Sequence, residues 1–205
     1  MPRKKVITDR RERIIQAADS LFKHYGVEKT TMEDISREAG IPRATIYLEF
    51  PNGKGDILMA SIENYLGNLL GQMREIARES KASRLETLKQ IILYNIMTNY
   101  DRTSIFQYDP ANLDRYAKRA REEITSYFQD RGELYTELFQ QASLQGEIST
   151  EYDFTRLAEL VSQAQRAFIP PIIYTLNRDK VERDANAVFT LLMAGISKNR
   201  QASAI

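Results

Sequence analysis

Three polar side chains that lie close together in the sequence could hydrogen-bond to a DNA duplex. Arg43, Thr45 and Tyr47 place a guanidinium, an aliphatic hydroxyl and a phenol within five positions of the chain. An arginine can pair bidentately with guanine, whereas a tyrosine hydroxyl more often bonds a phosphate, which positions a protein without specifying a base. This chemistry requires that one exposed helix present these side chains, so the neighbouring residues have to build and hold that helix.

The residues around this segment predict a helix-turn-helix. Thr31 can cap a first helix, with Asp34 three residues later as its capping-box partner. Gly40 suits a turn with positive φ, and Ile46 can fill the gap between two closely crossing helices. Pro42 fits the first position of the second helix, where its missing N–H costs nothing. The same pattern also fits a plain helical hairpin inside an all-α core, and this alternative stays open.

A preceding amphipathic segment supplies a third helix. Gly26 follows it as a stop signal. Together the three helices would form a complete unit for DNA recognition, with the last helix exposed. The apolar residues that keep helical spacing in this segment are Ile14, Ile15, Ala18, Leu21, Phe22 and Tyr25.

Residues 9–60 resemble the TetR (tetracycline-repressor) family of bacterial transcriptional regulators. The resemblance implies an all-α fold, in which an N-terminal helix-turn-helix DNA-binding domain precedes a C-terminal helical bundle for ligand binding and dimerisation. Beyond residue 60 the similarity is architectural only. The positions that carry the resemblance are Ala17, Ala18, Leu21, Phe22, Tyr25, Gly26, Thr30, Thr31, Ile35, Ala39, Gly40, Ile41, Thr45, Ile46, Tyr47, Phe50, Lys54 and Leu58.

The chain departs from the family pattern directly after the tyrosine. Leu48 stands where the family often has histidine, Glu49 stands where it often has an aromatic residue, and the turn before Lys54 is one residue longer. A carboxylate would repel phosphate, so we expect Glu49 to face away from DNA or to pair with a nearby cation. The resemblance assigns Lys54 a phosphate contact at the start of the next helix. The expected DNA-contact set is Thr31, Pro42, Arg43, Ala44, Thr45, Tyr47, Leu48 and Lys54.

A basic arm precedes the first helix. Residues 1–13 hold six lysines and arginines against two carboxylates. Such an arm can lie along phosphates or reach into the minor groove. A solvated, disordered leader is the alternative, and both hold if the arm orders only on DNA.

Composition excludes several classes of protein. The chain has 205 residues, no cysteine and a formal net charge of +1, so neither a disulfide framework nor a thiolate metal site is expected. The N-terminus lacks an apolar signal core, and no apolar run approaches the length of a membrane span. We therefore expect neither export nor membrane insertion, and the resemblance implies a protein of the bacterial cytoplasm. His24 is the sole histidine, and without a catalytic constellation or a phosphate-binding loop we expect no enzyme, no metal and no cofactor.

Helical periodicity continues to the end of the chain. It predicts helices over 55–79 and 119–145, a short helix from Pro110, one opened by Asp153 and a final one over about 180–198. A capping box at Ser83 opens another helix, whose middle, IILYNIM, should be buried. Pro170-Pro171 end or kink the helix before them. We expect residues 1–53 to form the arm and DNA-binding domain and residues 54–205 the effector-binding and dimerisation domain.

The resemblance implies a ligand pocket and a dimer interface in the second domain. For any one pocket residue, plain core packing is the alternative, and for the interface residues it is packing within one subunit. Expected pocket residues are aromatic, aliphatic or soft side chains at mid-helix: Leu66, Tyr94, Met97, Phe106, Tyr108, Tyr127, Phe128 and Phe168. Expected interface residues lie on the last two long helices: Ala158, Ala164, Ala187, Leu191, Ala194 and Gly195.

The sequence as a whole predicts a sequence-specific DNA-binding regulator. We expect it to bind a palindromic operator as a homodimer. The resemblance implies that it acts as a repressor, which a small hydrophobic or aromatic effector releases from DNA. A regulator controlled by a protein partner, with no small-molecule pocket, is the alternative. A closed internal cavity would favour the effector, and an exposed apolar groove would favour the partner.

Overall fold

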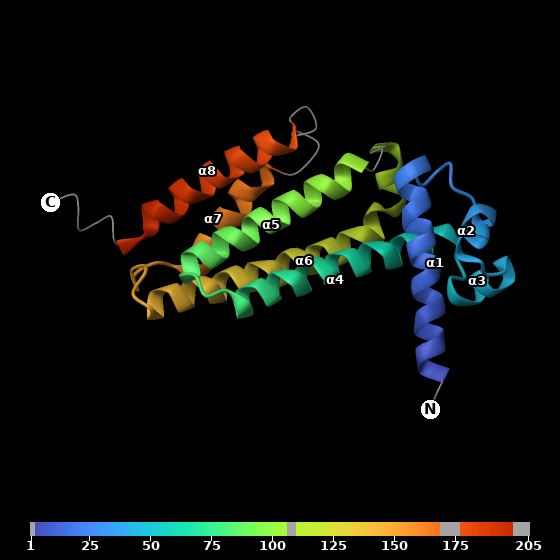
Figure 1. Cartoon of the computed structure of the whole chain (residues 1–205), viewed down its shortest axis with the longest axis horizontal. Coiled ribbons are helices and arrows are strands. Elements are labelled where there is room, and N and C mark those ends of the chain that lie inside the picture. The colour runs from blue at the N-terminus through green and yellow to red at the C-terminus, as the bar shows by residue number, and fades with distance from the viewer. Residues whose placement is uncertain (1–2, 106–109, 169–176, 199–205) are drawn as a thin grey trace. The chain divides into compact units, whose positions relative to one another are not determined.

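The computed structural model is all-α, as predicted (Figure 1). It describes the backbone of residues 3–105, 110–168 and 177–198, and the side chains of residues 10–102, 120–168 and 177–198. Within these ranges, the single β-type pairing is a bridge between Ile148 and Ser197. The helices are α1 (Arg3–Tyr25), α2 (Met32–Ala39), α3 (Arg43–Glu49), α4 (Lys54–Glu79), α5 (Arg84–Ile105), α6 (Pro110–Leu144), α7 (Phe154–Arg166) and α8 (Arg178–Ile196).

Contacts divide the chain into two compact units. Unit 1 runs to Gly67 and includes Thr103–Thr125, whereas unit 2 consists of Asn68–Arg102 and the chain from Ser126 onward. The functional boundary expected after residue 53 coincides with the start of α4, but the packing of unit 1 continues along that helix. The boundary therefore stays a prediction about function.

Local signals set the helix ends of unit 1 as the sequence predicts. Gly26 ends α1 with φ +81°, and Gly40 follows α2 with φ +63°, a region that strains any residue with a side chain. The capping box is complete: the Asp34 N–H donates to the Thr31 hydroxyl at 3.1 Å, and the Thr31 N–H donates to the Asp34 carboxylate at 3.0 Å. These signals determine where α2 begins and ends, and so where the chain turns into α3.

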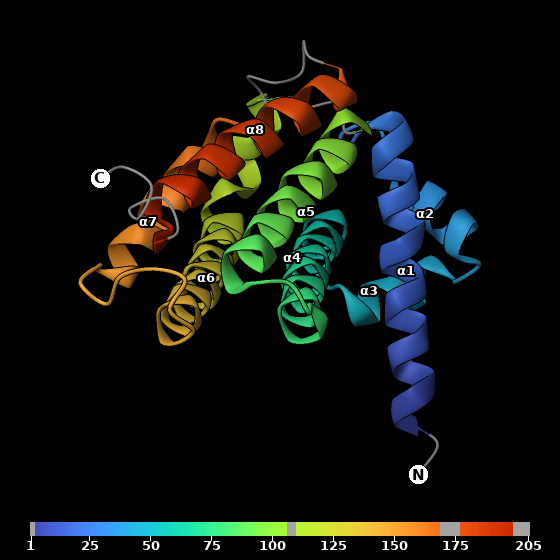
Figure 2. The same ribbon diagram turned by 60° about the vertical axis from the view of Figure 1, so that its left-hand side comes forward.

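An apolar cluster joins the helices of unit 1, and α2 and α3 lie against α1 in both ribbon views (Figures 1 and 2). Ile46 is fully buried between the helices, which confirms its predicted role. Each side chain of this size contributes about 1.5–3 kcal/mol when it leaves water. The fully or almost fully buried members are Ile14, Ala18, Phe22, Ile35, Ile46, Phe50 and Ile57.

The structure corrects three expectations. Pro42 is the N-cap of α3, with φ −56° and ψ +140°, and the helix begins one residue later than predicted. The expected short helix at Pro110 and the helix over 119–145 are one continuous helix, α6, which tolerates Gly132 in its interior. The backbone is helical from Arg3, so the basic arm is largely an extension of α1. Pro170-Pro171 lie outside the described residues.

Unit 2 contains the rest of α4, most of α5, the second part of α6, and α7 and α8 (Figure 2). The middle of α5 is buried in most of the predicted segment, where Ile91, Asn95 and Ile96 are fully enclosed, but Leu93 and Tyr94 are half-buried. Asp153 caps α7 as predicted, because its carboxylate accepts the Arg156 N–H at 3.0 Å. Asn177 caps α8 in the same way. None of the helices in the described ranges combines the length and the apolar character that crossing a bilayer requires.

Candidate nucleic-acid interface and ligand groove

The short helix α3 is anchored by one face and bare on the other. Ile46 holds it to the apolar cluster, whereas Arg43 and Ala44 are exposed and Thr45 is half-buried. Leu48 is 81% exposed, so it does not cover the hairpin, and Tyr47 is 40% exposed. The helix thus offers a guanidinium, a phenol and two apolar side chains to whatever it meets.

Arg43 is held loosely in a position from which it can reach outward. Its Nη1 lies 3.5 Å from the Glu33 carboxylate on α2, and both side chains are exposed. Exposed ion pairs of this kind contribute about 0–1 kcal/mol, so a base edge can replace the carboxylate at little cost.

The longer turn before α4 positions Tyr47. Gly53 has φ +65°, and a Cβ there would lie 3.3 Å from Cε1 of the Tyr47 ring. Asn52 closes the turn, because its N–H and side-chain amide both donate to the Asp56 carboxylate. The ring of Tyr47 therefore packs directly on this turn, where a side chain at position 53 would be strained by the positive φ and would crowd the ring.

Glu49 pairs with a cation, as predicted. Its carboxylate lies 3.8 Å from Nη1 of Arg10, and its backbone carbonyl accepts from Arg11 at 3.1 Å. The Arg11 guanidinium also stacks over the Phe50 ring, 4.3 Å from its centre. The acidic departure from the family pattern is thus neutralised by the basic face of α1.

Two members of the expected contact set have structural partners here. Nζ of Lys54 donates to the carbonyls of Val27, Glu28 and Thr30 at 2.6, 3.2 and 3.0 Å, which uses all three ammonium protons. The hydroxyl of Thr31 is engaged in the capping box. Their phosphate contacts stay predictions, and Lys54 would have to release a carbonyl to make one.

Unit 2 carries a buried polar network across its core. The Asn95 amide of α5 donates to the Tyr127 hydroxyl of α6, and the Gln165 amide of α7 donates to the Asn95 side-chain oxygen. Tyr135 completes the network by donating to Gln165 at 3.0 Å. Burial raises the pKa of Tyr127 and that of Tyr135, so both phenols stay neutral.

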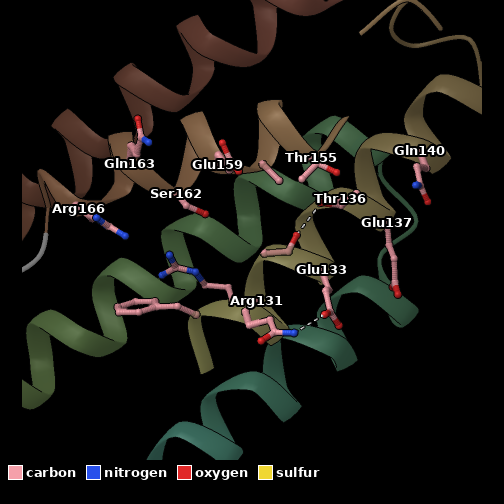
Figure 3. Close-up of a pocket in the computed structure, with 14 residues that line it drawn as sticks. Arg131, Glu133, Thr136, Glu137, Gln140, Thr155, Glu159, Ser162, Gln163 and Arg166 are labelled. Atoms are coloured by element: carbon pink, nitrogen blue, oxygen red, sulfur yellow. Dashed lines mark hydrogen bonds between the residues drawn. The ribbon is translucent and has the colours of Figure 1, made fainter. Parts of the chain in front are cut away.

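An open groove of about 580 Å³ lies between α6 and α7 (Figure 3). This volume lies within the usual range for small-molecule sites. Its lining combines the Phe128 ring with charged and hydroxyl side chains from both helices. The labelled side chains in Figure 3 are Arg131, Glu133, Thr136, Glu137, Gln140, Thr155, Glu159, Ser162, Gln163 and Arg166.

Of the expected pocket residues that the structure describes, only Phe128 lines this groove. Tyr127 belongs to the buried network, Met97 is buried, and Phe168 lies against Phe189 with the ring planes tilted by 51° and the ring centres 6.1 Å apart. Tyr94 is half-buried in unit 2, Leu66 is half-buried in unit 1, and Phe106 and Tyr108 have no described side chains.

Sequence reasoning missed Arg131, Asn95 and Gln165, all of which are buried. A usable signal was present: each stands on the apolar face of its helix, where a polar side chain interrupts the stripe. Arg131 lies three and four residues from Phe128, Tyr127 and Tyr135, and so shares their face.

The expected dimer residues differ in their exposure and form three groups. Ala158 is buried within the subunit and lines the groove, which agrees with the alternative of internal packing. Ala164 and Ala194 are half-buried, whereas Ala187, Leu191 and Gly195 are exposed on α8. Three further apolar residues are exposed on α7 and α8, and the sequence analysis did not select them: Leu160, Val188 and Leu192.

No group of three or more potential metal-ligating side chains occurs in the described part of the chain. His24 is exposed in the last turn of α1, with Nδ1 2.9 Å from the Ser20 carbonyl oxygen.

Comparison with known proteins places these features in context. Residues 14–60 match the family described as "Bacterial regulatory proteins, tetR family". YxaF of Bacillus subtilis (strain 168), an uncharacterized HTH-type transcriptional regulator, is 26% identical over 105 residues, which are 51% of this chain and 54% of YxaF. The match thus spans about half the length of that relative.

Solved structures share the fold over nearly the whole chain. The TetR-family transcriptional regulator of Cytophaga hutchinsonii has a TM-score of 0.71 at 18% identity and covers 92% of this chain and 94% of its own. FadR of Bacillus subtilis in complex with stearoyl-CoA has a TM-score of 0.65 at 21% identity, with 90% of this chain and 98% of its own covered. At such identities the likeness concerns the fold alone.

Proposed function

Because the chain is a transcriptional regulator of the TetR family, we propose that it acts in the bacterial cytoplasm as a homodimeric repressor. The dimer binds a palindromic operator through α3, and a small effector bound in unit 2 releases it. A ligand releases DNA in this way only if it binds more tightly to a state that fits the operator poorly.

The exposed face of α3 on a closed apolar core is the observation that carries the proposal. Arg43 pairs with a guanine, and the Leu48 or Ala44 side chain touches a thymine methyl group. Tyr47 contacts a phosphate and fixes the register. The near-complete burial of Ile46 and Phe50 supports this assignment, because it holds the helix rigidly beneath its exposed residues.

Dimerisation is supported by an exposed apolar stripe on α8. Val188, Leu191 and Leu192 are 37%, 65% and 40% exposed at helical spacing. A single three-helix unit buries too little surface to select one site in a genome, so two copies related by a two-fold axis would read two half-sites.

The lining of the α6–α7 groove favours a small effector over a protein partner. A partner helix would need a continuous apolar groove, whereas this one mixes an aromatic ring with charged side chains. The groove is open, so it is not the closed cavity that we expected for an effector. The polar side chains of its lining are what support a small effector. The fold-related FadR binds stearoyl-CoA, which is consistent with an effector that has an apolar body.

Binding-site selection from random duplex DNA with the full-length protein tests the proposal. We expect a palindromic consensus, together with a dimer in size-exclusion chromatography at micromolar concentration. Heparin serves as the polyanion control. Equal binding of selected DNA and heparin, or a monomer that enriches no sequence, would contradict the proposed function.

A further inference from the structure

We propose that Arg131 anchors the carboxylate of an organic acid whose aromatic or aliphatic body lies in the groove between α6 and α7. This inference rests on the proposed function only in taking that acid as the effector. Binding of the acid itself is measurable without DNA, so the two ideas can fail separately.

Arg131 is a buried charge without a charged partner among the described residues. Its side chain is 1% exposed, and its Nε is closed off from solvent with no hydrogen-bond partner. Its guanidinium lies among the rings of Phe128, Tyr135 and Tyr127, 4.9, 5.6 and 5.8 Å from their centres. Burial raises the pKa of both tyrosines despite the nearby charge of Arg131 and its side-chain hydrogen bond to Tyr127, so neither phenol supplies a negative charge.

Leaving a guanidinium in such surroundings is costly. Cation–π contacts recover part of the lost hydration, but a buried charge ordinarily requires a counter-charge or a full set of hydrogen bonds. An arginine cannot lose its proton to avoid the cost. The site is therefore incomplete until an anion reaches it from the groove that Arg131 lines.

A second guanidinium faces the same ring from the opposite helix. Arg166 of α7 lies 5.8 Å from the centre of the Phe128 ring, over which Arg131 also stacks. Figure 3 shows both arginines at one end of the groove, with Ser162 beside them as a possible hydroxyl donor. Two like charges repel when they converge on one ring, and a carboxylate between them would convert that repulsion into attraction.

The remaining charges of the groove select a monoanion. Glu133 and Glu137 lie toward the other end in Figure 3, and Glu159 pairs with Arg156 at 2.8 Å. A phosphate dianion would meet more repulsion from these carboxylates than a single carboxylate would. The Phe128 ring adds an apolar surface next to the anchor, so the acid needs an apolar body.

Calorimetric titration of the full-length protein without DNA tests the site. The probes are benzoate, 2-naphthoate and decanoate, each paired with its neutral amide. We expect at least one acid to bind about tenfold more tightly than its amide, because only the acid makes charge-assisted hydrogen bonds to arginine. Naphthyl phosphate should bind more weakly than 2-naphthoate.

Two substitutions locate the effect. Arg131→Met should remove most of the preference for acid over amide, and Arg166→Gln, at an exposed position, should weaken acid binding several-fold while sparing the amide. Arg78→Ala removes an exposed arginine of α4 and should change neither. If Arg131→Met does not fold, the acid-to-amide ratio of the unaltered protein and the Arg166→Gln result decide.

Equal affinity for acid and amide in all three pairs, or an acid preference that survives Arg131→Met, would overturn the inference. So would the absence of binding by every acid, and naphthyl phosphate binding as tightly as 2-naphthoate would overturn the choice of a carboxylate. An acid that binds through Arg131 but leaves the operator complex intact would contradict its role as effector and leave the binding site standing.

Discussion

The cores of the two units are built on different principles. In unit 1 the buried cluster is apolar, and the buried polar side chains beside it are two small hydroxyl residues, Thr30 and Ser61, whose hydroxyls donate to the Gly26 carbonyl and to the Asp19 carboxylate. In unit 2 the core encloses Asn95, Gln165 and Arg131. An apolar core holds a surface rigid at low cost, whereas buried polar groups cost stability unless every partner is present. Unit 1 therefore has a core that holds α3 in place at low cost, whereas the core of unit 2 contains polar groups whose burial costs stability.

Breaking the apolar core should have the largest effect. Ile46→Ala should destabilise the protein by about 2–5 kcal/mol, because it removes a fully buried side chain and leaves a cavity. Urea unfolding followed by circular dichroism measures the loss. Leu48→Ala on the same helix is the matched control, and it should change stability by about 0.5 kcal/mol or less because Leu48 is exposed. Equal losses for the two variants would show that α3 is not anchored as described.

Removing the side chain that we propose to contact a base should weaken DNA binding and leave the stability of the protein unchanged. Arg43→Ala should weaken binding to the selected operator by about 1–3 kcal/mol, with relaxed preference at one base position of each half-site. Gel-shift titration at fixed salt measures it. Arg78→Ala deletes the same charge in unit 2 and should leave operator affinity unchanged; an unaffected Arg43→Ala protein would remove the residue from the reading set.

The polar core of unit 2 should respond in the opposite direction to the apolar one. Arg131→Met should stabilise the ligand-free protein by about 1–2 kcal/mol, because an apolar side chain of similar length replaces an uncompensated buried charge. Thermal unfolding in the absence of any organic acid measures the gain. A lower midpoint would mean that the aromatic rings, and not a missing anion, account for this arginine.

Removing the N-cap of α2 should have the smallest effect on stability. Thr31→Ala should cost about 0.5–1 kcal/mol through loss of the α2 cap. The Thr31 hydroxyl and N–H hold the pKa of Asp34 below its ordinary value of 3.8. The carboxylate therefore contributes stability in full above pH 3.8, and that contribution is lost as the pH falls through the lowered pKa. Unfolding titrations at pH 6 and at about pH 2.5 should show a smaller difference between the variant and the original chain in acid; a constant difference would argue against the box.

Local chemistry made unit 1 predictable. Gly40, the Thr31–Asp34 pair and the apolar spacing of α1 act within a few residues of one another, so the sequence displays them directly. Contacts between distant residues escaped prediction. The Glu147 carboxylate accepts the backbone N–H groups of Arg84 and Leu85, and so caps α5 from 62 residues or more away.

The site in unit 2 was less accessible to sequence reasoning for a physical reason. Aromatic residues at helical spacing fit a pocket wall and plain core equally well, and Tyr127 and Met97 proved to be buried. The informative residues were polar ones on apolar faces, Arg131 and Gln165 among them. These residues belong to no motif, and they are recognised because burying a polar side chain lowers the stability of the fold.

The hydrogen bonds that hold the Lys54 ammonium have a practical consequence. Its ammonium donates to three backbone carbonyls of the connection before α2. Because these acceptors are neutral groups and not carboxylates, dissolved salt should weaken the contact less than it weakens an ion pair. Concentrated salt competes strongly with lysine and arginine for phosphate. A high-salt column wash should therefore remove nucleic acid from the purified protein while the contact between Lys54 of α4 and the connection from α1 to α2 stays intact, and desalting alone should restore operator binding.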